Sequence, residues 1–160
     1  PGTPGTEHRL GGLEKDSLTG EISYDPENHE RMVLLRDEKI KRIKTDLPLL
    51  EIIGPEKNEL LVVTWGSVFG PAFSAIEELQ DKGHPVSMVH LRHINPFQNN
   101  LEKILNNFKK VLVPEMNLGH LSRLLRSEFL VKTIPFAKVQ GRPFLISEIR
   151  NRVLELLDEN

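Results

Sequence analysis

The chain has 160 residues, of which 38% are hydrophobic and 28% charged, and its formal net charge is −2 at pH 7. These proportions are typical of a globular protein, and a chain of this length fits one domain that buries roughly 70% of its unfolded surface. The slight acidic excess argues against a nucleic-acid partner, because nucleic-acid-binding domains usually carry a basic excess. No stretch contains the ~18 consecutive apolar residues that a membrane span requires, so we expect no membrane partner either.

Cysteine is absent from the chain. Its absence excludes disulfides, a thiol nucleophile, cysteine-ligated zinc and cysteine-bound iron–sulfur clusters within these residues. Because no signal peptide opens the sequence, we expect a cytoplasmic protein. The first residue is Pro1 rather than Met, which favours a piece of a longer polypeptide.

The sequence divides into an opening loop, a leading helix and a main domain. Residues 1–24 hold five glycines and two prolines without hydrophobic periodicity, so we expect a loop or linker that belongs to a preceding domain. A leading helix is predicted over residues 25–47, because Asp25 can cap it and Pro26 suits a first turn, where no N–H is needed. Residues 48–160 then form an α/β domain.

The main domain alternates short valine-rich runs with amphipathic stretches. A continuous apolar run such as ELLVVTW is typical of a strand buried on both faces. Apolar residues spaced three and four apart predict helices between these runs. We predict strands at 59–65, 85–91, 110–114 and 132–139, and helices between Ser67 and Gly83, at 99–108, at 118–129 and after the N-cap Ser147.

This alternation determines the predicted fold class. Strands that alternate with helices of about 10–15 residues require right-handed crossovers and a mainly parallel sheet. We therefore predict a three-layer α/β/α fold, in which helices cover both faces of the sheet. Pro135 marks an edge or a bend of the last strand, because proline cannot donate a hydrogen bond to a ladder.

The segment TWGSVFGPA places Gly66 and Ser67 between a strand and the start of a helix. Backbone N–H groups at such a turn can hold an anion. The segment matches neither G-x-G-x-x-G nor the phosphate-binding loop, and it contains no lysine. We favour a tight turn that lets the strand and the helix pack closely.

The segment VPEMNLGHLSRLLR leaves a strand at its carboxyl end, where ligands bind in open α/β sheets. Glu115, Asn117, Gly119 and His120 are therefore candidates to face a cleft or an interface. The alternative is structural, with Asn117 capping the helix and Glu115 accepting backbone N–H bonds. The residues alone leave both interpretations open.

The segment HLRHINPF contains His90, Arg92 and His93. Two histidines three positions apart at a strand end point to opposite faces, and no set of carboxylate ligands accompanies them. Because a metal site needs several convergent ligands, we expect none here.

Two further candidates lie near the start of the chain. Arg36 falls at the centre of the apolar stripe of the leading helix, so it must extend past the core edge or find an acidic partner. We favour a stem folded over the core edge rather than a ligand contact. His8 and Arg9 belong to a loop that could close over an active site built elsewhere, although charged loops are usually only solvated.

Five segments carry a resemblance to a known family. They are PGTPGTEHRLGGLEKDSLTGEISYDPENHERMVLLRDEK, VVTWGSVFGPA, HLRHINPF, VLVPEMNLGHLSRLLRSEFLV and KVQGRPF. Together they resemble the C-terminal part of the alpha subunit of 2-oxoacid:ferredoxin oxidoreductases, the 2-oxoglutarate type most closely. The resemblance covers nearly the whole chain in order, and it implies that Pro1 is an internal position.

The resemblance implies an enzyme that oxidatively decarboxylates a 2-oxoacid and forms an acyl-CoA. The cofactors implied for the full enzyme are thiamine diphosphate, Mg²⁺, an iron–sulfur cluster and CoA. The implied partners are the rest of the alpha subunit, a beta subunit and ferredoxin, which receives the electrons. The fold implied for this piece is similar to the transketolase C-terminal domain.

The chain also departs from the family pattern. It has neither a Gly-Asp-Gly…Asn-Asn pattern for a Mg²⁺–diphosphate site nor cysteines for a cluster, so by resemblance both sites belong to the beta subunit. Relatives tend to read Gly-Ser-Thr-Tyr-Gly at residues 66–70, and the missing Thr and Tyr hydroxyls support the packing interpretation there. Relatives also tend to read Gly-Gln-Leu at 119–121, where this chain places His120.

We therefore expect a packing and interface component that has no catalytic residue and binds no metal or cofactor by itself. Two alternatives remain. One is a stand-alone α/β module that binds a small ligand or a nucleotide. The other is a domain that only docks subunits together.

Overall fold

The computed structural model describes residues 2–7 and 11–159. The chain divides into two compact units, Pro1–Asp46 and Leu47–Asn160, and each is described by itself. Within the described residues, no helix combines the length and the apolar character that crossing a membrane requires.

The first unit contains the helix α1 (Pro26–Ile43) and the irregular segment that precedes it. As predicted, the Asp25 carboxylate caps the helix by accepting the Glu27 N–H at 3.1 Å, and proline occupies the first turn. An isolated antiparallel bridge between Lys15 and Ile22 turns the preceding segment back on itself.

The second unit is built on a five-stranded sheet with the order β1-β3-β2-β4-β5. The strands are β1 (Ile52–Ile53), β2 (Asn58–Trp65), β3 (Val86–Leu91), β4 (Phe108–Glu115) and β5 (Thr133–Ala137). Four of them are parallel, whereas β1 pairs antiparallel with β3. The mainly parallel sheet is thus confirmed, and Pro135 lies in an edge strand.

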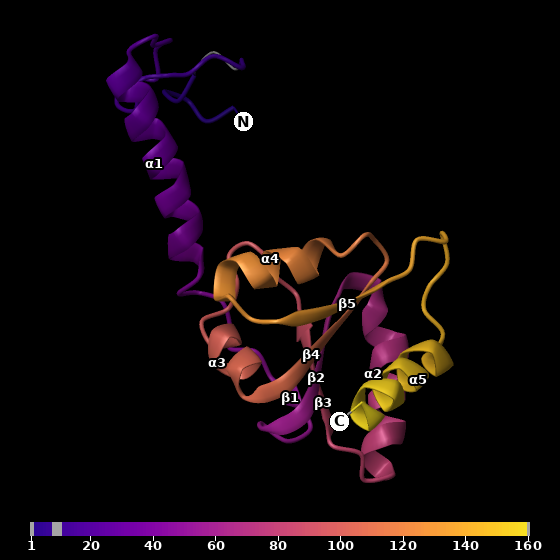
Figure 1. The fold of residues 1–160 in the computed structure, drawn as a ribbon. Helices are drawn as coiled ribbons and strands as arrows, with labels where there is room; N and C mark the ends of the chain where they lie inside the picture. The colour runs from indigo at the N-terminus through magenta and orange to yellow at the C-terminus, as the bar shows by residue number, and fades with distance from the viewer. Residues whose placement is uncertain (1, 8–10, 160) are drawn as a thin grey trace. The chain divides into compact units, whose positions relative to one another are not determined.

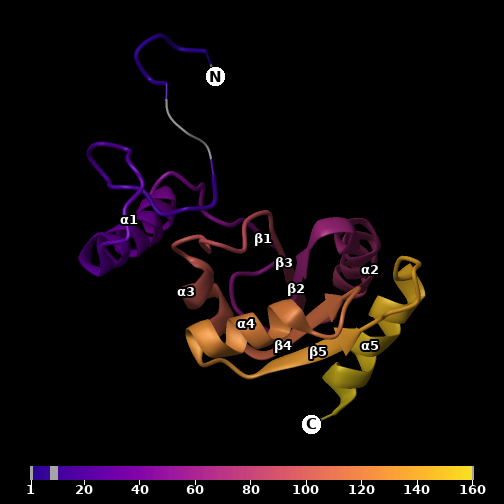
Figure 2. The same cartoon turned by 90° about the horizontal axis from the view of Figure 1, so that it is seen from above.

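Helices cover both faces of this sheet, which confirms the three-layer α/β fold (Figure 1). They are α2 (Phe69–Asp81), α3 (Leu101–Asn106), α4 (His120–Phe129) and α5 (Ile146–Asp158). Figure 2 shows α2 and α5 together on one side of the sheet, with α3 and α4 on the other. In β2, Leu60 and Val62 face the first pair of helices, while Leu61 and Val63 face the second. Successive side chains of a strand alternate between faces, so one apolar run supplies both cores.

The leading helix, predicted to extend to residue 47, ends at Ile43. Two further predicted boundaries are wrong, one at β4 and one at α4. Phe108 begins β4 instead of ending a helix, because it pairs with Asn58 of β2 and is buried in the core beneath α3 and α4. The helix predicted from residue 118 begins only at His120. Gly119 before it adopts a left-handed backbone with φ of +83°, and the Asn117 side chain holds that turn.

The cap predicted at Ser147 is also wrong, because α5 begins after Leu145. The Glu148 carboxylate accepts the Leu145 N–H at 2.7 Å and so performs the role of a capping side chain. Lys138 Nζ donates to the same carboxylate at 2.7 Å, which ties the loop after β5 to the start of α5.

Side-chain amides fix the segment before β2 to the sheet. Gln80 Nε2 donates to the carbonyl oxygens of Ile53 at 3.1 Å and Val86 at 3.0 Å. Asn100 accepts the Leu50 N–H at 3.0 Å and donates to the Leu50 carbonyl at 2.9 Å. These bonds hold a two-residue antiparallel strand that would otherwise have little to stabilise it.

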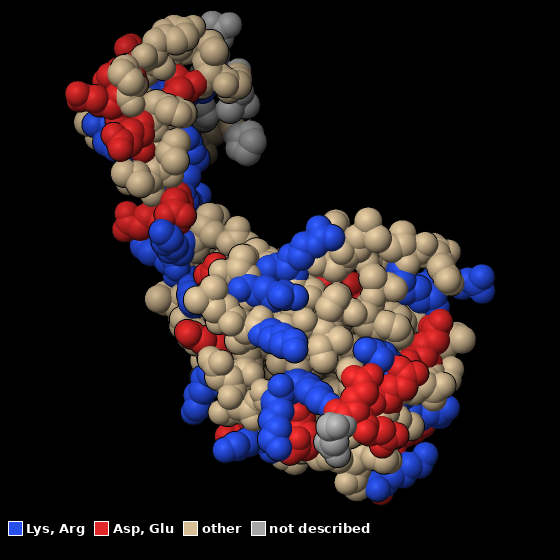
Figure 3. All heavy atoms as spheres, in the orientation of Figure 1, with Lys and Arg blue, Asp and Glu red and all other residues tan. Residues whose placement is uncertain are grey.

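Both basic and acidic side chains lie on the visible face of the second unit, with acidic ones over α5 (Figure 3). Nucleic-acid-binding proteins usually present a clustered basic surface. The visible face of the second unit is mixed in charge and does not have this character.

Gly54 is expected to be intolerant of any side chain. Its φ is +104°, and a Cβ there would collide with Gln80 Nε2. Because the left-handed backbone alone costs a side chain about 1–2 kcal/mol, we expect Gly54→Ala to lower the free energy of unfolding by about 2 kcal/mol or more. Urea denaturation measures this change.

Gly70→Ala is the matched control. Gly70 lies within α2, where a Cβ meets open space. We expect this substitution to leave stability unchanged or to raise it by up to about 1 kcal/mol, since alanine favours a helix over glycine. Equal losses in the two variants would show that the Gln80 contact does not control stability.

Candidate functional site

The turn between β4 and α4 is organised by the buried carboxylate of Glu115. Its two oxygens accept the N–H groups of Leu121 at 2.8 Å and Ser122 at 2.9 Å. These N–H groups belong to the first turn of α4, where no intrahelical carbonyl reaches them, and a negative charge is favourable at that helix end. Glu115 therefore joins β4 to α4 and is not open to solvent.

Asn117 completes the same turn. Its Oδ1 accepts the N–H groups of Gly119 at 2.8 Å and His120 at 2.9 Å. Both Glu115 and Asn117 therefore accept backbone N–H bonds of the turn, which is the structural one of the two roles that the sequence left open. His120 is exposed at the start of α4, and whether this turn faces a cleft or an interface stays a prediction.

Gly66 and Ser67 lie in a short 3₁₀ turn, Gly66–Val68, between β2 and α2. Ser67 Oγ lies 3.7 Å from the sulfur of Met116, so the turn after β2 lies beside the turn after β4. The sequence candidates of the second unit therefore gather at one edge of the sheet, the edge formed by the carboxyl ends of its parallel strands.

A cavity of about 350 Å³ lies beside the carboxyl end of β3. His90 at the end of this strand lines it, together with Arg92, His93 and Gln98 from the following loop, and Phe69 from the start of α2. The segment before β2 forms the remaining wall.

His90 is a partly buried titratable side chain in the wall of this cavity. Its Nδ1 is 2.9 Å from Thr64 Oγ1, and its ring meets Phe69 edge-on with 4.8 Å between ring centroids. Burial first, and then the nearby charge of Arg92, lower the pKa of His90 below its ordinary value of 6.5. The imidazole is therefore neutral at pH 7.

Gln98 is a buried polar residue in the cavity wall, and its hydrogen bonding is incomplete. The residue is 3% exposed, and its Nε2 lies 3.5 Å from His93 Nδ1. Its Oε1 has no hydrogen-bond partner within the part of the chain that the structure describes. A buried acceptor without a donor costs about 1–3 kcal/mol, so it calls for an explanation.

The expectation that His90 and His93 point to opposite faces is wrong, because both line this cavity. Strand β3 ends at Leu91, so His93 already lies in the loop and no longer follows the alternation of a strand. Across residues 2–7 and 11–159, no group of three or more His, Cys, Asp or Glu side chains is placed to hold a metal ion.

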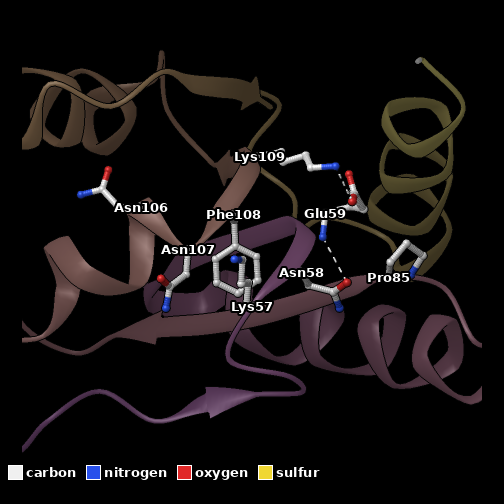
Figure 4. A pocket seen from close by; sticks show the side chains of 8 residues that line it. All are labelled: Lys57, Asn58, Glu59, Pro85, Asn106, Asn107, Phe108 and Lys109. Carbon is white, nitrogen blue, oxygen red and sulfur yellow. Dashed lines mark hydrogen bonds and ion pairs between the residues drawn. The ribbon is translucent and has the colours of Figure 1, made fainter.

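A cavity of about 420 Å³ lies at the opposite edge of the sheet, at the amino ends of β2 and β4 (Figure 4). Lys109 Nζ forms an ion pair with Glu59 at 2.7 Å on one side of it. Although this cavity is larger, ligands of open α/β sheets bind outside the carboxyl ends of the strands. We therefore regard the cavity beside β3 as the better candidate.

Arg36 in the first unit has found an acidic partner. Its guanidinium donates to both oxygens of Glu14, at 3.1 and 3.2 Å, and His29 Nδ1 lies 2.9 Å from the same carboxylate. Arg36 is half-exposed, so its stem is not folded over a core edge as we expected. The apolar stripe of α1 is mostly exposed within this unit, which removes the core that such a stem would cover. The candidates His8 and Arg9 lie outside the described residues.

The model of the pyruvate:ferredoxin oxidoreductase core domain II family matches residues 58–149 of this chain. The chain belongs to this family. The matched range begins with β2 and ends within α5, so core domain II comprises nearly the whole parallel sheet and the loops at its carboxyl edge.

Curated relatives of this core domain II are subunits of larger enzymes. The chain is 46% identical over 150 residues to the 2-oxoglutarate oxidoreductase subunit KorA of Mycobacterium tuberculosis, covering 93% of this chain and 23% of that subunit. It is 32% identical over 153 residues to the alpha subunit of 2-oxoacid:ferredoxin oxidoreductase 2 of Aeropyrum pernix, covering 92% of this chain and 24% of that subunit. The chain thus spans about a quarter of the length of these relatives.

Solved structures confirm the fold of core domain II. The 2-oxoglutarate:ferredoxin oxidoreductase of Magnetococcus marinus, solved with 2-oxoglutarate, coenzyme A and succinyl-CoA bound, matches with a TM-score of 0.88 and 34% identity, over 98% of this chain and 28% of that one. A split-gene transketolase, an inactive beta4 tetramer, matches with a TM-score of 0.51 and 16% identity over 64% of this chain and 39% of that one. The second likeness shows the fold alone, and it agrees with the transketolase-like architecture expected from the sequence.

Glu115→Gln is expected to destabilise core domain II. A carboxamide offers one acceptor where the carboxylate offers two, so one of the N–H groups of Leu121 and Ser122 loses its partner. Because both are buried, we expect the free energy of unfolding to fall by about 2 kcal/mol in chemical denaturation. The same change at Glu128, which is exposed in α4, should alter it by less than about 0.5 kcal/mol. If both variants are equally stable, the Glu115 carboxylate does not hold the turn.

The acid titration of Glu14 tests the contact in the first unit. The hydrogen bond from Arg36 and then the one from His29 lower the pKa of Glu14 from 4.5 to about 2. Because the folded pKa is depressed, the contact contributes stability above about pH 4.5 and loses it as the pH falls toward 2. NMR titration should show the low pKa of Glu14, and Arg36→Gln should raise it toward 4.5. The control variant Arg42→Gln should leave the pKa of Glu14 unchanged. If Arg36→Gln also leaves the pKa of Glu14 unchanged, the pairing of Arg36 with Glu14 is contradicted.

Proposed function

We propose that this chain forms part of the alpha subunit of a 2-oxoacid:ferredoxin oxidoreductase that acts on 2-oxoglutarate. Such an enzyme decarboxylates the 2-oxoacid with thiamine diphosphate, forms an acyl-CoA and passes the electrons to ferredoxin. The observation that carries the proposal is the 46% identity to a 2-oxoglutarate oxidoreductase subunit over 93% of the chain. The structural likeness to a 2-oxoglutarate:ferredoxin oxidoreductase supports it.

The cluster and the Mg²⁺–diphosphate implied for such an enzyme do not fit this chain. There is no cysteine to ligate an iron–sulfur cluster, and among the described residues no metal-binding group is present to anchor a Mg²⁺–diphosphate. The polar side chains of the turn after β4 are engaged by backbone N–H groups of the same turn. We therefore assign thiamine diphosphate, Mg²⁺ and the cluster to other parts of the enzyme, and no chemical step to this chain.

The role that we propose for the chain is packing against the rest of its own subunit. Large apolar side chains are exposed after three neighbouring strands of the sheet: Phe69 after β2 (40% exposed), Leu118 after β4 (67%) and Val139 after β5 (63%). Apolar groups exposed at one edge mark an interaction surface. Since the chain spans only about a quarter of its relatives, most of such a subunit remains to cover this edge.

The partners beyond the subunit follow from the same proposal. The relatives are named as subunits, which supports an assembly with a beta subunit. The name of the Aeropyrum pernix relative includes ferredoxin, which supports ferredoxin as the electron acceptor of the proposed enzyme. A cytoplasmic location, with neither nucleic acid nor membrane as a partner, is part of the proposal.

Substitution of Leu118 tests the packing role. In the 160-residue chain this side chain is already exposed, so Leu118→Gln should change the free energy of unfolding by less than about 0.5 kcal/mol. In the complete subunit a covered leucine contributes about 2 kcal/mol, so the same variant should lower stability there and sensitise the subunit to protease. Leu130→Gln is the matched control, because this leucine is 91% exposed at the other end of α4 and should have no effect in either context.

Turnover tests the activity separately. The complete enzyme should reduce ferredoxin only when both 2-oxoglutarate and CoA are supplied. Absence of this reaction in an enzyme that is fully assembled would overturn the proposed activity. Equal effects of Leu118→Gln and Leu130→Gln in the complete subunit would overturn only the packing role.

A further inference from the structure

The first unit has no apolar core of its own. Among its described residues only Asn28 is buried, and the helix α1 leaves Val33, Ile40 and Ile43 between 38% and 45% exposed. A helix of 18 residues is only marginally stable in water, because most helical stability in proteins comes from the packing of an apolar face. Contacts from outside this unit are therefore needed to stabilise α1.

A single charged residue interrupts the apolar stripe of α1. Val33, Arg36, Ile40 and Ile43 follow one another at intervals of three and four residues, so they share one face of the helix. A guanidinium without a partner would oppose burial of this face, since an isolated charge is costly to remove from water. Glu14 removes this obstacle, because its two oxygens accept hydrogen bonds from Arg36 at 3.1 and 3.2 Å.

The carboxylate of Glu14 is held against the helix by further contacts. His29 Nδ1 lies 2.9 Å from it, and Asn28 Nδ2 donates to the carbonyl oxygen of the neighbouring Lys15 at 3.0 Å. The Arg36–Glu14 pair is thus formed within the first unit itself. It carries no net charge and lies within the apolar stripe, where a partner surface can cover it without supplying a charge of its own.

We propose that the apolar stripe of α1 docks against the rest of the same alpha subunit and that the Arg36–Glu14 pair is buried in this contact. The inference rests on the proposed function, which makes the chain part of that subunit. The chain spans about a quarter of the length of its relatives, so most of such a subunit is available to cover the stripe. The match to the Magnetococcus marinus enzyme extends over 98% of this chain, so it includes α1, yet it covers only 28% of that single chain.

Two other occupants fit the stripe less well. The second unit offers no free face of its sheet, because its own helices cover both sides. A second copy of the chain would bring the same stripe and so place two Arg36–Glu14 pairs in one contact, where each pair would displace apolar area of the other. The surface that fits is apolar and has no charge opposite Arg36.

A photo-crosslinker in the complete enzyme identifies the occupant. Ile40 is replaced by p-benzoyl-L-phenylalanine, and the crosslinked peptides are identified by mass spectrometry. Leu34 is the matched control position, because it is 60% exposed and precedes Arg36 by two residues, which places it on nearly the opposite side of the helix. We expect position 40 to join a peptide of the same subunit that lies outside these 160 residues, with a yield about tenfold or more above that of position 34.

Each other result of the crosslinking overturns the proposal. Crosslinks to a beta subunit or to a second alpha subunit would assign the stripe to a different occupant. Crosslinks confined to these 160 residues would assign it to the second unit, and equal yields at positions 34 and 40 would show that no surface covers the stripe.

Charge removal tests the burial of the pair. In a buried pair the loss of one partner is costly, whereas replacement of both partners by groups without charge is tolerated. In the complete subunit, Glu14→Gln should therefore raise the rate of thermolysin cleavage about tenfold or more, and the addition of Arg36→Met should restore slow cleavage. Glu38→Gln is the matched control, since this exposed carboxylate of α1 should alter the rate by less than about twofold.

An unchanged cleavage rate in Glu14→Gln, or equal rates in the single and the double variant, would show that the pair is not buried and would overturn the proposal. Neither measurement requires turnover. Failure of the docking proposal therefore leaves the proposed activity on 2-oxoglutarate unaffected, and an assembled but inactive enzyme leaves the docking result unaffected.

Discussion

The double-sided burial of β2 is the constraint on which the second unit depends. Leu60, Leu61, Val62 and Val63 are all fully buried, although successive side chains point to opposite faces. Such a strand is stable only when helices cover both faces, and parallel neighbours on each side then require crossover connections. The carboxyl ends of β2, β3 and β4 are thereby aligned at one edge. The burial of β2 therefore determines where the candidate sites at that edge lie.

The polar groups at that edge fall into two classes. Glu115 and Asn117 are satisfied by backbone N–H groups of the turn to which they belong, and this makes them part of the framework. Gln98 is buried without a donor for its Oε1 among the described residues, whereas Arg92 is an exposed side chain. An unpaired buried acceptor adds nothing to the stability of the fold, and this distinguishes Gln98 from Glu115 and Asn117.

The first unit is organised differently, because polar contacts rather than an apolar core join its parts. Arg36, His29 and Glu14 join α1 to the segment before it, while most of the apolar residues of the helix remain exposed. A contact of this kind is sensitive to pH and salt, whereas the cores on the two faces of the sheet are not. The apolar stripe of α1 fits the proposal that the chain is part of a larger subunit, since such a stripe is normally covered.

The sequence by itself determined the α/β class, the order of the elements and the family, because buried parallel strands read as continuous apolar runs and because family motifs are local in sequence. It could not determine the antiparallel β1, the exact start of α4 or the partner of Arg36. These depend on side chains that are distant along the chain, such as Gln80 with Ile53 and Arg36 with Glu14. The cavity beside β3 was decided by the tertiary structure alone. Glu51, Phe69, Arg92 and Gln98 have no common periodicity, and only the packing of the sheet brings them to one wall.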